Sequence, residues 1–196
     1  MDQQQIETTL AVAQAMADEL TDYLMGDSLY RQLMVKTSTG VRQPKMTIGA
    51  LLESVQLLDW EQDQLDGQQR QQLAAMEERI AIARGAFAAQ WGALLRRELK
   101  ALLDSWRWYL DDAGRDAEAR ERYSQEAHIR TRIDVVQAEL ASDPQAAEQR
   151  SDLGNLDARL RPMLAGRGFS GPRDSESRYP PSQAWWLYGQ PSGDEQ

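Results

Sequence analysis

Residues 5–24 read QIETTLAVAQAMADELTDYL, and this stretch decides the fold class. Its apolar side chains recur at intervals of three and four residues, the spacing of one face of an α-helix: Ile6, Leu10, Ala13, Ala17, Leu20 and Leu24. An apolar stripe on one side of a helix has to be buried against other elements. The stretch therefore predicts an amphipathic helix of about five turns that packs on one side.

The same spacing predicts further helices along the chain. Thr47 is placed to cap a helix that carries Leu51, Leu52, Val55 and Leu58. Residues 68–111 keep apolar side chains at helical spacing, which predicts one long central helix, or a helix kinked near Gly85 or Gly92. Residues 116–140 and a shorter segment after residue 144 predict two more helices.

Two segments do not have the helical pattern. Residues 36–46 are polar and contain glycine and proline, so we expect a loop there. After Ala165 the composition changes to glycine, proline and aromatic residues. We therefore predict a helical domain over residues 1–165 and an irregular C-terminal extension over residues 166–196 that docks on it.

Helices that each carry one apolar stripe, joined by short connections, favour an antiparallel bundle. The sequence therefore predicts an all-α fold with four to five helices, one long central helix and an irregular aromatic C-terminal segment. A solenoid of helical pairs is the alternative, although no repeat period stands out.

Charge and composition limit the classes of partner that the protein can have. The 196 residues include no cysteine, which excludes disulfides, thiolate zinc sites and cysteine nucleophiles. The formal net charge of −9 is spread along the sequence. Nucleic-acid binders and proteins of anionic membranes present clustered Lys and Arg, so this balance argues against both. No apolar run approaches the ~20 residues of a membrane span, and residues 1–5 have no basic signal-like region, so we expect a cytoplasmic protein.

The residue types give little support to enzymatic chemistry. Di-iron bundles need a Glu-x-x-His pair on each of two helices, whereas His128 is the single histidine here. It falls roughly 140° around its helix from Ile133, on the polar side, which favours a solvent-exposed side chain over a ligand or a base. We expect a non-enzymatic protein with no catalytic residue, metal site or cofactor. An enzyme built from Asp, Glu, Arg and Tyr would need two carboxylates in a cleft.

Four small residues share one face of the long helical segment: Ala81, Gly85, Ala89 and Gly92. Glycine destabilises a helix interior by up to ~1 kcal/mol relative to alanine, so two glycines on one face suggest a compensating contact. One interpretation is a central helix packed by neighbours on two sides. The other is the self-association seam of a homodimer, with Glu78 and Arg96 beside it.

The C-terminal aromatic residues are the second group that stands out: Tyr179, Trp185, Trp186 and Tyr188. Disordered tails are poor in aromatic residues, so we expect this segment to dock on the helices, with Trp185 or Trp186 near Trp60 or Trp106. The alternative is a recognition motif for a partner protein.

From these features we expect a protein that acts through protein–protein contact, as a scaffold, adaptor or accessory subunit. Its partner would be another protein or a second copy of itself in a homodimer. The alternative is a small-molecule sensor with an aromatic pocket lined by Trp91, Trp106 and Met76.

Overall fold

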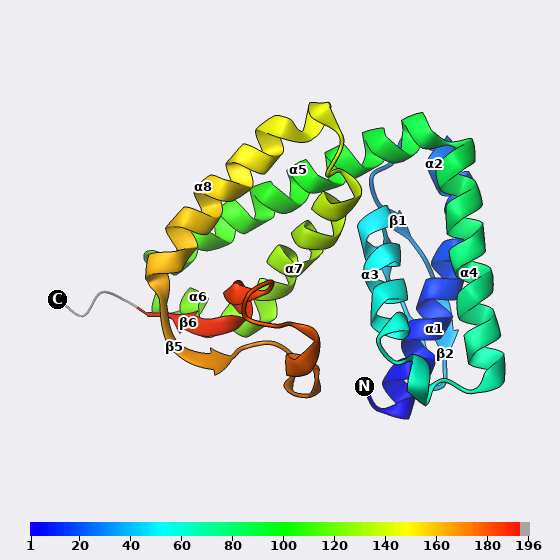
Figure 1. Cartoon of the computed structure of the whole chain (residues 1–196), viewed down its shortest axis with the longest axis horizontal. Coiled ribbons are helices and arrows are strands. Elements are labelled where there is room, and N and C mark those ends of the chain that lie inside the picture. The colour runs from blue at the N-terminus through cyan, green and yellow to red at the C-terminus, as the bar shows by residue number, and fades with distance from the viewer. Residues whose placement is uncertain (193–196) are drawn as a thin grey trace. The chain divides into compact units, whose positions relative to one another are not determined.

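The computed structural model describes residues 1–192 (Figure 1). In this range it is mostly helical, as predicted, with eight α-helices and three two-stranded antiparallel sheets. Contacts divide the chain into two compact units, residues 1–98 and residues 99–196. The predicted boundary lay after residue 165, whereas this division falls inside helix α5 (Ala88–Ala113), which contributes to both units.

Three helices of the first unit run up, down and up in Figure 1: α1 (Gln3–Asp18), α3 (Ile48–Asp59) and α4 (Gly67–Ala86). Helix α2 (Leu20–Met25) follows α1, and a 3-10 turn, η1 (Gln62–Gln64), precedes α4. Helices α1 and α4 each begin with a capping box, in which Asp2 or Asp66 accepts a hydrogen bond from a backbone amide one turn on. The apolar stripes meet in a core that includes Ile6, Leu10, Ala13, Leu51, Leu58, Leu73 and Met76.

The expected loop at residues 36–46 is instead part of a β-hairpin. Strands β1 (Arg31–Gln32) and β4 (Lys45–Met46) pair antiparallel, as do β2 (Val35–Thr37) and β3 (Gly40–Arg42). The side chains of Leu33 and Val35 are buried, whereas that of Met34 between them is exposed. Burial alternates here as it does in a strand, but the sequence has no such alternation because Leu33, Met34 and Val35 are all apolar. Gly40, with φ +121°, lies at the turn.

The long central helix is interrupted at Phe87. Its backbone angles, φ −121° and ψ 37°, are not helical, so α4 ends at Ala86 and α5 begins at Ala88. Figure 1 shows the chain changing direction sharply at this point. The break falls close to Gly85, one of the two positions where the sequence allowed a kink.

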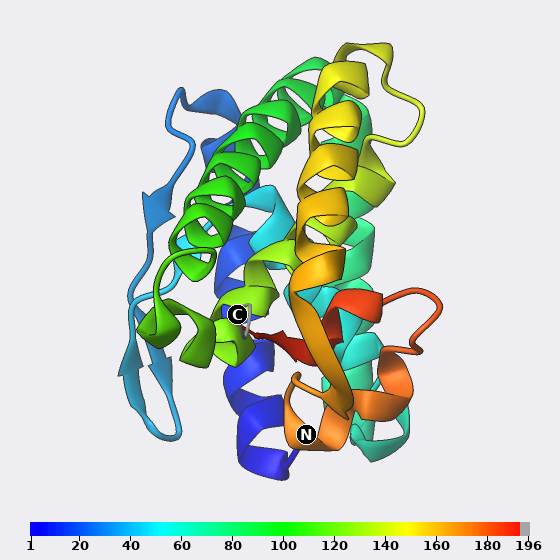
Figure 2. The ribbon, with the colours of Figure 1, turned by 90° about the vertical axis from the view of Figure 1, so that its left-hand side faces the viewer.

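The second unit contains the rest of α5, α6 (Ala117–Glu121), α7 (Tyr123–Glu139) and α8 (Ala147–Met163), with a 3-10 turn, η2 (Pro144–Ala146), before α8. Helices α5 and α8 lie side by side and point the same way, and α7 runs opposite to both (Figures 1 and 2). Ion pairs join α5 to α8: Arg107 to Asp152 at 3.2 Å and Arg159 to Asp111 at 2.5 Å.

The C-terminal segment is partly regular, unlike the irregular extension that was expected. Strand β5 (Leu164–Phe169) pairs antiparallel with β6 (Tyr188–Pro191), and the 3-10 helices η3 (Arg173–Arg178) and η4 (Trp185–Leu187) lie between them. Gly189 has φ +107°, and a Cβ atom there would lie 3.0 Å from the carbonyl oxygen of Ala165. The close pairing of the two strands therefore requires glycine at this position.

Candidate functional site

The C-terminal aromatic residues contact helices of their own unit. Trp186 is 2% exposed, and its Nε1 donates a hydrogen bond to Thr131 Oγ1 at 3.1 Å. The Tyr123 hydroxyl donates to the backbone carbonyl of Trp186. The Arg130 guanidinium lies 4.0 Å from the centre of the Trp186 ring. These contacts tie η4 to α7.

The other aromatic residues of this segment are half-buried. Trp185 carries the Arg161 guanidinium 3.7 Å from its ring centre. The Tyr188 hydroxyl donates to the Tyr179 carbonyl at 2.8 Å, and its ring lies 5.4 Å from that of Phe169. In this arrangement the segment packs its largest aromatic side chains against its own unit. Less of their surface is then exposed for contact with a partner protein.

Arg130 is the buried cation that organises this contact. It is 4% exposed and forms two hydrogen bonds with Asp157 of α8, from Nε at 2.8 Å and from Nη2 at 2.9 Å. Asp134 lies 3.7 Å from its Nη1. A buried guanidinium needs such a bidentate partner to offset its loss of hydration. The group links α7, α8 and Trp186, which is a structural role.

Glu98 is the buried carboxylate of the first unit, at 2% exposure. It accepts a hydrogen bond from the Thr47 hydroxyl at 2.5 Å and from the Gly49 backbone amide at 2.9 Å. Thr47 in turn accepts from the Ala50 amide, as the predicted N-cap of α3. A carboxylate at this helix N-terminus satisfies donors that have no partner in the helix, so Glu98 is also explained structurally.

The predicted small-residue seam is divided between two helices, because Phe87 separates Ala81 and Gly85 on α4 from Ala89 and Gly92 on α5. Ala81, Gly85 and Ala89 are exposed. A Cβ atom at Gly85 would meet no heavy atom within 4 Å, so neighbouring helices do not cover this position. Packing by neighbours on two sides is therefore not observed at Gly85, and self-association at the seam stays a prediction.

The residues proposed to line an aromatic pocket are core residues. Trp91 and Met76 are buried in the first unit, and Trp106 is buried in the second. The Trp106 ring stacks on Tyr109 at 5.2 Å. The side chain of His128, by contrast, is exposed, as its position on the polar side of its helix predicts. Core filling accounts for the three buried side chains.

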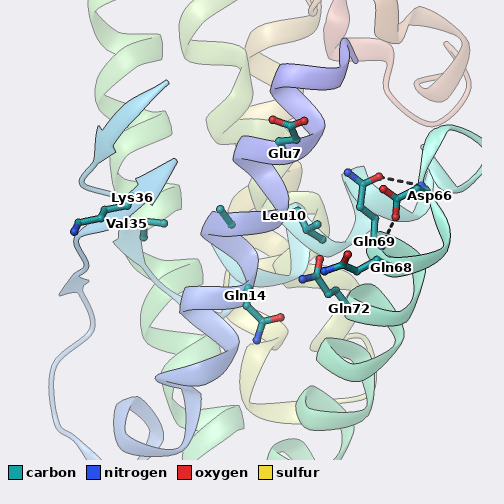
Figure 3. Close-up of a pocket in the computed structure, with 10 residues that line it drawn as sticks. Glu7, Leu10, Gln14, Val35, Lys36, Asp66, Gln68, Gln69 and Gln72 are labelled. Atoms are coloured by element: carbon teal, nitrogen blue, oxygen red, sulfur yellow. Dashed lines mark hydrogen bonds between the residues drawn. The ribbon is translucent and has the colours of Figure 1, made fainter. Parts of the chain in front are cut away.

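A polar groove of about 390 Å³ lies in the first unit between α1, the start of α4 and strand β2. Figure 3 shows Gln14 of α1 and Gln68 and Gln72 of α4 around it. The Gln14 amide donates to Asp18 at 2.9 Å, and Gln69 is engaged in the capping box of α4. Surface glutamines of this kind hydrogen-bond to water or to a polar ligand equally well, so the groove itself selects no ligand.

A second groove, of about 510 Å³, lies in the second unit between α5 and the start of α7. We call it the Trp108 groove, and it is lined by Asp104, Ser105, Trp108, Tyr109, Asp112, Arg122, Glu126 and Ile129. Trp108 is 73% exposed, which is unusual for the largest side chain. From the sequence, Trp106, Trp108 and Tyr109 span two faces of the long helix and are expected to fill the core, which is wrong for Trp108. Trp108 lies two residues after the buried Trp106, roughly 200° around the helix, and this places it on the uncovered face.

The floor of the Trp108 groove is a buried aromatic side chain, and most of its charged lining side chains are acidic. Tyr109 is buried there, and its hydroxyl donates to the Ala119 carbonyl at 3.3 Å. Burial raises the pKa of the Tyr109 phenol above its usual value, and the nearby Glu126 carboxylate raises it further. The phenol therefore stays protonated at neutral pH. Three carboxylates and one guanidinium are among the lining side chains.

Within residues 1–192, no group of three or more His, Asp and Glu side chains is placed to hold a metal ion. No helix in the same range combines the length and the apolar character that crossing a membrane requires. Comparison of the chain with models of known protein families, with curated proteins and with solved structures found no match.

Proposed function

We propose that this protein is a non-enzymatic, cytoplasmic contact module, a scaffold, adaptor or accessory subunit that binds a protein through the Trp108 groove. The exposure of Trp108 beside a groove is the observation that carries the proposal. Tryptophan is enriched among the residues that contribute most to binding at protein interfaces, where it is seated in a pocket and shielded from water. In the free chain the Trp108 indole has no such shield.

The surroundings of Trp108 also support a contact role. Ile129 is half-buried on the same groove, and the aromatic floor is formed by Tyr109, which packs on Trp106. Because the floor is held by the core of the unit, binding would order few side chains, and this limits the entropy cost of association. A buried aromatic floor with a polar rim matches the usual composition of a protein interface, which has an apolar core and a polar rim.

The partner could be a different protein or a second copy in a homodimer, and one experiment addresses both. Native mass spectrometry on the untagged chain, purified gently from the cells that make it, gives the mass of any complex. We expect a complex of defined stoichiometry that Trp108→Ala weakens by about 30-fold or more, since residues of this class contribute about 2 kcal/mol or more.

Met25→Ala is the matched control, because Met25 is 64% exposed on α2 of the first unit and lines no part of the Trp108 groove. It should leave the complex intact. Circular dichroism should be unchanged in both variants, since neither side chain is in the core. A chain that is purely monomeric, or a complex that survives Trp108→Ala, would refute the proposal.

A further inference from the structure

The charges around Trp108 point to the chemistry of the partner. Of the carboxylates on the Trp108 groove, Asp104 is held by Arg107 at 2.8 Å. Arg122 lies 3.6 Å from Glu118, outside the groove lining. Within residues 1–192, the side chains of Asp112 and Glu126 form no ion pair or hydrogen bond. The groove therefore holds two carboxylates that form no ion pair, beside one guanidinium, that of Arg122, which pairs with Glu118.

Three of the other five tryptophans have an arginine guanidinium beside the ring. Arg84 lies 5.2 Å from the ring centre of Trp91, Arg130 lies 4.0 Å from that of Trp186, and Arg161 lies 3.7 Å from that of Trp185. A cation over an indole face is attracted by the ring quadrupole, and tryptophan is the best aromatic partner for it. In the described part of the chain, no cation covers the ring of Trp108.

We infer that the Trp108 groove binds an arginine-bearing segment of a different protein, with a guanidinium over the Trp108 ring and its charge met by Asp112 and Glu126. Arginine fits better than lysine, because its planar group stacks on the ring and offers several donors to the carboxylates. The inference rests on the proposed function and adds the class of residue that is recognised.

A second copy of the chain is a poorer occupant than a basic partner. Each copy carries a formal net charge of −9, so two copies repel one another at long range. A basic segment is attracted to the same surface, which speeds its association as well as stabilising the complex. The expected partner segment is therefore rich in arginine and free of acidic residues near the contact.

The test is a titration of the full chain labelled with 5-fluorotryptophan and followed by ¹⁹F NMR. The Trp108 resonance is the one missing from a Trp108→Phe sample. The probes are two peptides, acetyl-Arg-Leu-Arg-Arg-Leu-Arg-amide and the same peptide with glutamate in place of arginine. We expect a saturable shift of the Trp108 resonance with the arginine peptide and none with the glutamate peptide. Higher salt should weaken the binding.

Charge removal in the groove separates the inference from a general charge effect. The double variant Asp112→Asn, Glu126→Gln should raise the Kd of the arginine peptide about tenfold, since each carboxylate near the cation contributes a screened Coulomb attraction. The matched control is Asp63→Asn, Glu77→Gln, which changes two exposed carboxylates of the first unit. It should leave the Kd within about twofold, because neither side chain lines the Trp108 groove.

The results distinguish this inference from the proposed function. If the arginine peptide leaves the Trp108 resonance unmoved, or binds both double variants equally, the inference is wrong. The proposed function would still stand if Trp108→Ala disrupts the native complex. A complex made of two copies of the chain alone would also overturn the inference, because its occupant is then not a basic partner.

Discussion

Replacing Asp157 with alanine should destabilise the second unit strongly, because it strips the buried Arg130 of its bidentate partner. Removing one member of a buried ion pair costs about 3–5 kcal/mol, since the remaining charge is uncompensated. Two features reduce the cost here. The Asp157 side chain is 18% exposed, so water can reach the vacated site, and Asp134 lies 3.7 Å from Arg130. We expect a loss of about 2–3 kcal/mol in the free energy of unfolding.

Asp134→Ala is the matched control, since it removes a carboxylate near the same arginine from a side chain that is 59% exposed. Exposed ion pairs contribute about 0–1 kcal/mol, so this variant should be nearly neutral. Urea and thermal unfolding, followed by circular dichroism, measure both variants. At about 2–4 °C per kcal/mol for a chain of this size, Asp157→Ala should lower Tm by roughly 5–10 °C. Equal effects of the two variants would refute the role assigned to Asp157.

Three further predictions concern stability. Glu98→Ala should lower the free energy of unfolding, measured in urea, by about 2–3 kcal/mol, because the Thr47 hydroxyl and the Gly49 amide lose a buried acceptor. A loss below about 1 kcal/mol would contradict this prediction. Gly85→Ala should raise stability by about 0.5–1 kcal/mol, since the new methyl group meets open space in a helix, and a lower Tm would count against it. Burial raises the pKa of the Tyr123 phenol above its usual value. The unfolded chain therefore releases this proton near pH 10 while the folded chain still holds it, so stability should fall as the pH rises above about 10. Tyr123→Phe should lose less free energy of unfolding between pH 9 and 11 than the wild type does, and an identical loss would contradict the prediction.

Much of the helical content could be predicted from the sequence because it depends on local patterns. Ile6, Leu10 and Ala13 are buried at the predicted spacing, and Thr47 caps α3 as expected. The apolar stripe of a helix is specified within a few turns, and a cap is specified within one. These features therefore need no knowledge of distant parts of the chain.

The break and the hairpin depend on the rest of the fold, so the sequence left them open. The apolar pattern of residues 68–111 is compatible with both a straight and a broken helix. The pattern therefore does not predict that Phe87 leaves the helical conformation. Strand β2 has three residues, which is too short for the alternation of Val35 and its neighbours to stand out from a loop.

The exposure of Trp108 was hidden for a different reason. A tryptophan near Trp106 and Tyr109 is expected in the core, because large aromatic side chains usually contribute there. Trp106 and Tyr109 are indeed buried, whereas Trp108 projects from the opposite side of α5 into solvent. Aromatic residues on two faces of one helix have the same composition and spacing whichever face is buried. The sequence therefore does not predict which of the two faces other elements cover.

The central proposal is tested most directly by site-specific photo-cross-linking in the cells that make the protein. Benzoylphenylalanine is placed at position 108 in one variant and at position 25 in another, since both native side chains are strongly exposed. We expect illumination to give a cross-linked product of one defined mass from position 108 and none from position 25. If neither position gives a product, or both give the same one, the Trp108 groove is not the contact site.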